Sequence, residues 1–263
     1  MAFWYYNNTG TYHVDLSNSD MGLDVYLCGS GPSLNNVNNK DLHCDGSFVV
    51  GVNNSYPKIK PHMWIGLDDP SCFHHKIWSD PCMKILRGGY QDRTYHGISI
   101  KNNHNLFYED CKEYEDFEKE SMFYNKPDRT MFYWDKTVIG TTLHILLHMG
   151  AKRIHLVGAD LDNSKKQYWN NIKRDKKVFT RNKNTYKQII EHYKWFRKIG
   201  LKYDVELISC TPNSPVNDFL KYIPLKEALK DTRKRRTFKK KKMLTGVDAE
   251  KIFKGDDEVQ KRK

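Results

Sequence analysis

The chain has 263 residues, of which 38% are hydrophobic and 29% charged, and its formal net charge is +12 at neutral pH. This length suits one large α/β domain with appendages and argues against a second full domain, because single cores stop growing beyond about 250–300 residues. No stretch approaches the ~18 apolar residues of a membrane span, and the first residues lack the pattern of a secretion signal. We therefore expect a soluble, cytoplasmic protein.

The six cysteines form no CxxC pair and no regular framework. A chain of this length does not need disulfide stapling, so we expect reduced thiols. The histidines show no spacing that indicates a metal site. His144 and His148 would share one helix face, but the leucines around them favour packing over metal binding.

Five short apolar runs, each closed by Gly, Pro, Asn or Asp, predict the core strands. They lie at 25–28, 47–52, 63–67, 153–158 and 204–210. Each run is apolar on both faces, which is typical of strands buried between helix layers. Helical stretches at 137–149 and 187–199 alternate with them. The sequence therefore predicts an α/β fold with a Rossmann-like, mostly parallel sheet flanked by helices.

The remaining segments suggest a division of the chain. Residues 1–20, rich in aromatics and Asn, form an N-terminal arm, and 21–229 form the nucleotide-binding domain, with 71–135 as a helical and irregular lid. Residues 230–263 form a basic tail, in which Lys230 to Met243 hold nine Lys or Arg and one Asp. Such a cluster attracts phosphate backbones or anionic surfaces. A disordered, solubilising tail is the alternative.

A glycine-rich turn follows the first core strand. It consists of Gly29, Ser30, Gly31, Pro32 and Ser33. Glycines let the backbone approach an anion closely, and Ser33 would cap the next helix and direct its amides toward phosphate. The spacing is neither a Walker A loop nor GxGxxG, so by itself the turn is also compatible with a simple connection.

Polar side chains close the other predicted strands. Because ligands bind outside the carboxyl ends of parallel strands, we expect these residues at one cleft. They are Asn53, Asn54, Asp68, Asp69, Asp160, Asp162 and Asn213. Asp160 and Asp162 form a DxD pair, whose hard oxygen ligands suit Mg²⁺ or Mn²⁺ against a diphosphate. A loop or helix-cap role for Asp160 is the alternative.

Six motifs occur in an order that resembles a known family. They are CGSGPSL, FVVGVNNS, MWIGLDDPS, TVIGTTLHILLHMGAKRIHLVGADL, KNTYKQIIEHYKWF and CTPNSPVNDFL, between about residues 24 and 229. Together they resemble the bacterial lipooligosaccharide sialyltransferases and their relatives, the motility accessory factors and the archaeal pterin pyrophosphokinase-like proteins. The resemblance implies a GT-A-like Rossmann domain with a lid, which binds a nucleotide-activated group.

The resemblance also implies roles for single residues. Ser30, Gly31 and Asn53 fall where the family contacts the nucleotide, and Tyr168 matches a tyrosine near the phosphate. The turn of Pro212, Asn213 and Ser214 is shared.

Three positions depart from the pattern of the sialyltransferases. Arg181 stands in place of their catalytic histidine, Asp69 in place of an asparagine, and Asp162 in place of a second phosphate-side tyrosine. The added carboxylates favour a metal-assisted diphosphate donor over CMP-sialic acid.

These observations lead to the hypothesis of a glycosyltransferase that uses a nucleotide-sugar donor. Asp160 and Asp162 with a divalent ion would neutralise the leaving diphosphate, assisted by Arg181, and Asp68 or Asp69 would deprotonate the acceptor hydroxyl. The basic tail suggests a nucleic-acid acceptor, for instance a hydroxymethylated base in viral DNA. The alternatives are a pyrophosphokinase that acts with ATP on a small alcohol and a non-catalytic nucleotide- or nucleic-acid-binding protein.

Overall fold

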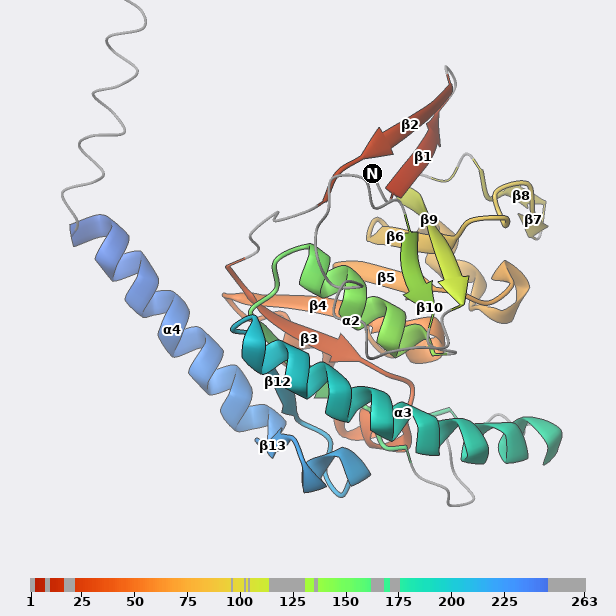
Figure 1. Ribbon diagram of the computed structural model, residues 1–263. Coiled ribbons are helices and arrows are strands. Elements are labelled where there is room, and N and C mark those ends of the chain that lie inside the picture. The colour runs from red at the N-terminus through yellow and green to blue at the C-terminus, as the bar shows by residue number, and fades with distance from the viewer. Residues whose placement is uncertain are drawn as a thin grey trace, which may run out of the picture.

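The computed structural model describes residues 3–7, 10–16, 22–95, 97–101, 103, 105–113, 131–134, 137–161, 168–170 and 176–245. In this part of the chain an eleven-stranded sheet forms the centre of the molecule (Figure 1). Its strands are β1 (Phe3–Asn7), β2 (Gly10–Val14), β3 (Asp24–Cys28), β4 (Ser47–Val52), β5 (Met63–Gly66), β6 (Met83–Arg87), β9 (Leu106–Glu113), β10 (Met131–Trp134), β11 (Arg153–Val157), β12 (Glu206–Ser209) and β13 (Lys221–Tyr222). A separate small ribbon pairs β7 (Thr94–Tyr95) with β8 (Ile98–Ser99).

The strand order is β13-β12-β11-β3-β4-β5-β6-β9-β1-β2, and β10 pairs with the far end of β9. From β13 to β9 every pairing is parallel, whereas the β1–β2 hairpin joins antiparallel at one edge. The predicted Rossmann-like parallel sheet is confirmed. The chain leaves β3 in one direction and returns to β11 on its other side, so the strand order reverses between β3 and β11.

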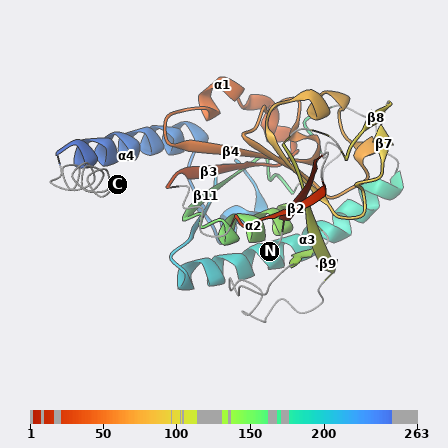
Figure 2. The same ribbon diagram turned by 90° about the horizontal axis from the view of Figure 1, so that it is seen from above.

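Four α-helices lie in the described residues, namely α1 (Asn39–Leu42), α2 (Val138–His148), α3 (Lys176–Lys202) and α4 (Leu225–Thr245). Figure 2 shows α2 and α3 on one face of the sheet and α1 and α4 on the other. None of these helices is both long and apolar enough to cross a membrane.

Alternate side chains of β3 point into two different cores, which explains why its sequence is apolar on both faces. Val25 and Leu27 belong to the core beneath α2 and α3, whereas Tyr26 and Cys28 belong to the core beneath α1 and α4. All four side chains are buried. A parallel strand covered by helices on both sides needs apolar residues at every position.

Helix α4 begins before the division that we drew between Leu229 and Lys230. Ala228, Leu229 and Thr232 are buried against the sheet. Thr232 Oγ1 donates to Asp24 Oδ2 at 2.5 Å, and Arg235 donates to the same carboxylate. The first half of the basic segment is therefore a docked helix.

The segment predicted as a lid, 71–135, supplies three strands of the sheet, and its other described residues form short helices, turns and the β7–β8 ribbon. Strands β6 and β9 extend the parallel array beyond β5, and β10 pairs with β9. The residues between β9 and β10 lie outside the described chain.

His155 on β11 couples the fold to pH. Its ring stacks on Tyr26 with centroids 4.6 Å apart and is fully buried. Burial lowers the pKa of His155 well below its usual range, and the Asp24 carboxylate, 3.9 Å from Nε2, opposes this only in part. The folded protein therefore holds His155 as neutral imidazole.

We predict that stability falls as the pH drops below about 6.5, where histidine titrates in an unfolded chain. The unfolded state then binds a proton that the folded state excludes, which lowers the free energy of unfolding by up to about 1.4 kcal/mol per pH unit. Urea unfolding of wild type and His155→Phe at pH 7.5 and 5.5 measures this, with exposed His75→Gln as control. Equal pH dependence in wild type and His155→Phe would contradict the prediction.

Candidate functional site

Two tight turns cross at the place where the strand order reverses. The Gly29 amide donates to the Val157 carbonyl at 2.8 Å, and the Gly31 amide donates to the Gly158 carbonyl at 2.9 Å. A Cβ atom on Gly29 would lie 2.7 Å from the Gly158 oxygen, and one on Gly31 would lie 2.6 Å from it. Only glycine permits two backbones to approach this closely.

The Asp160 side chain links these two turns by hydrogen bonds. Its Oδ1 accepts a hydrogen bond from the Ser33 amide at 3.0 Å, and its Oδ2 accepts one from the Ser33 hydroxyl at 2.8 Å. The amide belongs to the first turn of the short helix Pro32–Asn36. The prediction that Ser33 caps the next helix is wrong, because Ser33 lies inside the short helix and Gly31 occupies the cap position. Asp160 instead accepts from an amide at the start of this helix, close to the cap role that the sequence left as an alternative.

A cavity of about 590 Å³ opens beside the crossing. Its walls come from both turns, from the carboxyl ends of β4 and β5, and from α2 and α3. The lining residues are Ser30, Gly31, Val52, Asn53, Leu67, Asp68, Thr137, Val138, Ile139, Gly158, Ala159, Asp160, Leu161, Tyr168, Asn182, Thr185, Tyr186 and Ile189. The volume is in the range of small-molecule sites.

Asn53 places an unpaired hydrogen-bond acceptor at the cavity wall. Its backbone is left-handed, with φ of 45°, and its carbonyl accepts from Trp64 Nε1 at 2.9 Å. Asn53 Nδ2 donates to Asp68 Oδ2 at 3.3 Å, whereas Oδ1 is buried without a hydrogen-bond partner in the described structure. Because buried polar atoms are normally paired, this oxygen favours a ligand with an N–H or O–H donor.

The two neighbouring aspartates differ. Asp68 is exposed and lines the cavity. Asp69 caps the short helix Pro70–Cys72, and its Oδ1 accepts from the Ser71 hydroxyl at 2.7 Å and the Ser71 amide at 2.9 Å. These hydrogen bonds lower the pKa of Asp69, with a smaller contribution from Arg93. Asp69 does not line the cavity.

The N-terminus of α2 reaches the cavity through Val138 and Ile139. Thr137 caps the helix by accepting from the Gly140 amide at 3.0 Å. The amides of the first helical turn have no partner within the helix and lie at the positive end of its dipole. This end of α2 therefore offers an anion a favourable position.

One face of α3 forms the opposite wall, with Asn182, Thr185, Tyr186 and Ile189 at helical spacing. Asn182 Nδ2 donates to the Tyr168 hydroxyl at 2.7 Å, which fixes that hydroxyl at the wall. The sequence alone does not mark this face as part of a site. The i, i+3, i+4, i+7 spacing of these residues indicates one helix face, but such a partly polar face is equally typical of a solvent-exposed surface.

Trp169 ties the segment next to Tyr168 to the glycine turn. Its amide donates to the Ser30 carbonyl at 2.9 Å, and its Nε1 donates to the Asn54 carbonyl at 2.6 Å. Its own carbonyl accepts from Asn35 Nδ2 at 2.8 Å. Asn54 therefore serves the site through its backbone.

Six of the residues predicted for the site line one cavity, namely Ser30, Gly31, Asn53, Asp68, Asp160 and Tyr168. Gly29, Pro32 and Ser33 shape the turn behind it. Ser214 donates to the Ala159 carbonyl at 2.7 Å from outside the cavity, and its neighbour Asn213 is exposed. Arg181 lies on α3, but its side chain is outside the described part, as is Asp162.

The described residues do not form a metal-binding site on their own. They contain no group of three His, Cys, Asp or Glu side chains that could hold an ion. Both oxygens of Asp160 accept hydrogen bonds from Ser33. The Mg²⁺ or Mn²⁺ site at Asp160 and Asp162 stays a prediction.

A scan against protein-family models finds no match, and a search of curated proteins finds none. Among solved structures, the sialyltransferase CstII from Campylobacter jejuni with cytidine-5'-monophosphate is 18% identical, with a TM-score of 0.45, over 77% of this chain and 85% of that one. The same enzyme with CMP-3FNeuAc is 16% identical, with a TM-score of 0.44. It covers 77% of this chain and 86% of its own.

We predict that Gly31→Ala destabilises the protein by about 1–3 kcal/mol, because its Cβ atom would clash with the Asp160 carboxylate and the Gly158 carbonyl. Gly31 has φ of −69°, which alanine accepts, so the loss reports packing alone. Thermal unfolding measures it. Ser30→Ala, one residue away, is the control and should cost less than about 0.5 kcal/mol. Equal stability of the two variants would contradict the crossing described above.

Proposed function

We propose that the protein is a glycosyltransferase and that the cavity binds its nucleotide-sugar donor. The observation that carries the proposal is the cavity's position at the carboxyl ends of β3 and β11, where the strand order reverses. Open parallel sheets bind nucleotides at this point. The six-motif resemblance in the sequence supports the choice of a sugar-transferring enzyme.

The lining residues support separate positions for the nucleotide and the phosphate of the donor within the cavity. The unpaired Oδ1 of Asn53 accepts a hydrogen bond from the nucleotide, beside the glycine turn. The N-terminus of α2 receives the phosphate, where its amides stabilise the charge that develops on the leaving group. If Mg²⁺ or Mn²⁺ binds, it would add positive charge at the phosphate.

Asp68 is the candidate base. It lies in the cavity as an exposed carboxylate beside Asn53, where an acceptor hydroxyl that enters the cavity would meet it. The capped Asp69 is a weaker base because the hydrogen bonds from Ser71 stabilise its charged form. We therefore assign the proton transfer to Asp68 rather than to Asp69. Assistance by Arg181 stays a prediction.

Donor choice tests the proposal. Purified protein is incubated with CMP-, UDP- and GDP-sugars and with ATP, with and without Mg²⁺ or Mn²⁺, and released nucleotide is measured. We expect slow hydrolysis of one nucleotide-sugar. Release of AMP from ATP would favour the pyrophosphokinase, and binding without turnover would favour the non-catalytic alternative. The first result overturns the transferase, and the second overturns it if no turnover appears when hydroxyl acceptors are added.

For the donor so identified, we predict that Asp68→Asn lowers kcat by about 10²–10⁴-fold, because a positioned base contributes that much to proton transfer. Donor affinity should change little. Asp69→Asn is the matched control, since asparagine also caps a helix, and its kcat should stay within about threefold of wild type. Steady-state kinetics with varied donor decide the matter, and equal losses in both variants would count against Asp68 as the base.

The acceptor stays a prediction. A base in DNA was suggested only by the basic segment, and α4 carries that segment away from the cavity. Arg236 lies against Gly46, just before β4 begins, and Arg235 binds Asp24 at the start of β3. The cavity lies at the opposite ends of these strands. The docked part of the basic segment therefore lies away from the cavity.

A further inference from the structure

Two tryptophan side chains hold the turn that follows β4. The Nε1 atom of Trp64 donates to the Asn53 carbonyl at 2.9 Å, and the Nε1 atom of Trp169 donates to the Asn54 carbonyl at 2.6 Å. Trp64 is fully buried in β5, whereas Trp169 directly follows Tyr168, which lines the cavity. Two consecutive carbonyls are thus held by donors from two different parts of the chain.

The turn needs such support because the backbone of Asn53 is left-handed, with φ of 45°. Residues other than glycine keep this conformation only when the surrounding structure determines it. The Asn53 side chain reaches the cavity from this backbone. Its Nδ2 donates to Asp68 Oδ2 at 3.3 Å, and its Oδ1 is buried without a hydrogen-bond partner in the described structure. The direction of this free acceptor therefore depends on how the turn is held.

The main chain of Trp169 is fixed independently of its indole N–H. Its amide donates to the Ser30 carbonyl at 2.9 Å, and its carbonyl accepts from Asn35 Nδ2 at 2.8 Å. The ring packs against the core cluster that includes Leu34. Phenylalanine at position 169 would keep both main-chain hydrogen bonds and most of this packing. It would lose only the hydrogen bond to the Asn54 carbonyl.

We propose that Trp169 is a positioning residue, which acts through the Asn54 carbonyl to direct the Asn53 side chain toward the nucleotide. Because the ligand is the nucleotide of the proposed function, this role rests on that function. The role also gives the segment at Tyr168 a second task. Besides placing a hydroxyl at the cavity wall, the segment holds the turn that carries the acceptor on the opposite wall.

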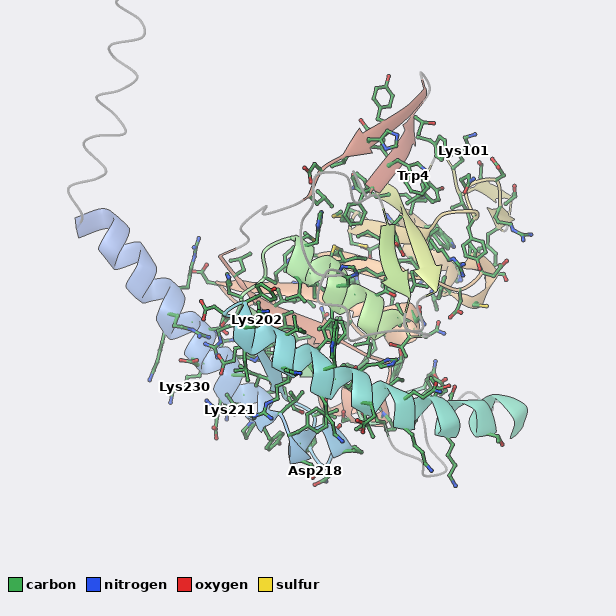
Figure 3. All side chains as sticks on the ribbon, in the orientation of Figure 1. Trp4, Lys101, Lys202, Asp218, Lys221 and Lys230 are labelled. Carbon is green, nitrogen blue, oxygen red and sulfur yellow. The ribbon has the colours of Figure 1, made fainter. Side chains whose placement is uncertain are left out.

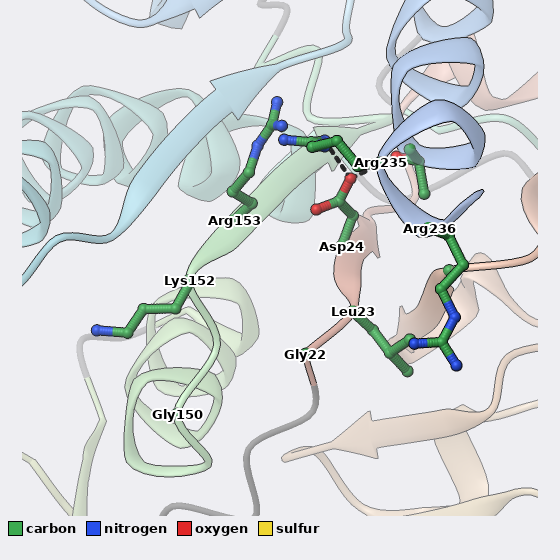
Figure 4. A pocket seen from close by; sticks show the side chains of 10 residues that line it. Gly22, Leu23, Asp24, Gly150, Lys152, Arg153, Arg235 and Arg236 are labelled. Carbon is green, nitrogen blue, oxygen red and sulfur yellow. Dashed lines mark hydrogen bonds and ion pairs between the residues drawn. The ribbon is translucent and has the colours of Figure 1, made fainter. Parts of the chain in front are cut away.

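A nucleotide is an anion, and a second cavity has cations at the amino ends of the strands. It has a volume of about 180 Å³, and Figure 4 shows Arg153 and Arg235 beside Asp24 at its wall. Arg235 pairs with Asp24, and both arginines pair with Asp231 at 3.2 Å. Because these carboxylates compensate the two cations, we place the nucleotide at Asn53 and use the second cavity as a control.

Four single variants of the full chain test the role of Trp169. The test variant is Trp169→Phe. Its matched control is Trp4→Phe, because Trp4 also packs, partly buried, against a core cluster. Trp4 lies on β1, which β5, β6 and β9 separate from β4 (Figure 3). Arg236→Gln removes a cation from the second cavity. Asn53→Gly removes the acceptor, and glycine accepts the left-handed backbone.

Two measurements separate the positioning of Asn53 from its use. Nuclear magnetic resonance of the ¹⁵N-labelled protein without ligand follows the Asn53 side-chain amide, whose signals are identified by their absence in Asn53→Gly. Calorimetric titration gives the affinity for the nucleotide released in the donor assay. Thermal unfolding checks that every variant folds.

We expect Trp169→Phe to shift the Asn53 amide signals and to weaken nucleotide binding about 3–10-fold, which is the effect of one hydrogen bond. Trp4→Phe and Arg236→Gln should behave as wild type. Added to Asn53→Gly, Trp169→Phe should cause no further loss, because it acts through the missing side chain.

Unshifted Asn53 signals, or the same loss with and without the Asn53 side chain, would overturn the role of Trp169. Loss of binding in Arg236→Gln alone would place the nucleotide in the second cavity and overturn it as well. If wild type binds no nucleotide, the proposed function fails, and the Asn53 signals alone decide whether Trp169 positions this side chain.

Discussion

The close approach of two backbone turns at the sheet's switch point determines the rest of the site. Because Gly29 and Gly31 lie against the Gly158 carbonyl, β3 and β11 end at the same level and their turns share one wall. Asp160 then bridges from one turn to Ser33 of the other. Asn53, the start of α2 and one face of α3 all meet beside this contact.

The central sheet was predictable because its strands are buried on both faces and carry apolar residues at every position. The additional strands were not, because charged residues interrupt their pattern. Lys84 in β6 is 1% exposed and Glu109 in β9 is 0% exposed, yet both read as surface positions. Helix α4 was missed for a related reason. Its anchors are few, and the polar Thr232 and Arg235 make the decisive contacts with Asp24 inside a strongly basic run.

The site was predictable where residues follow strands, since strand-end residues of a parallel sheet gather at one edge. It was not predictable for Asn182 and Thr185, which reach the cavity from a helix distant in sequence. Nor does sequence distinguish Asp68 from Asp69, because their difference depends on which carboxylate caps the next turn. The cavity lies at the carboxyl ends of the strands, whereas Arg235 of α4 contacts Asp24 near their amino ends.

The central claim is that a nucleotide binds between the glycine turn and α3. Calorimetric titration of the nucleotide released in the donor assay tests it most directly, with wild type, Thr185→Trp and Lys187→Trp. Thr185 lines the cavity, whereas Lys187 is exposed on the same helix. The account predicts that Thr185→Trp fills the cavity and weakens binding at least tenfold, while Lys187→Trp binds as wild type does. Undiminished binding by a folded Thr185→Trp variant would place the nucleotide elsewhere and contradict the account.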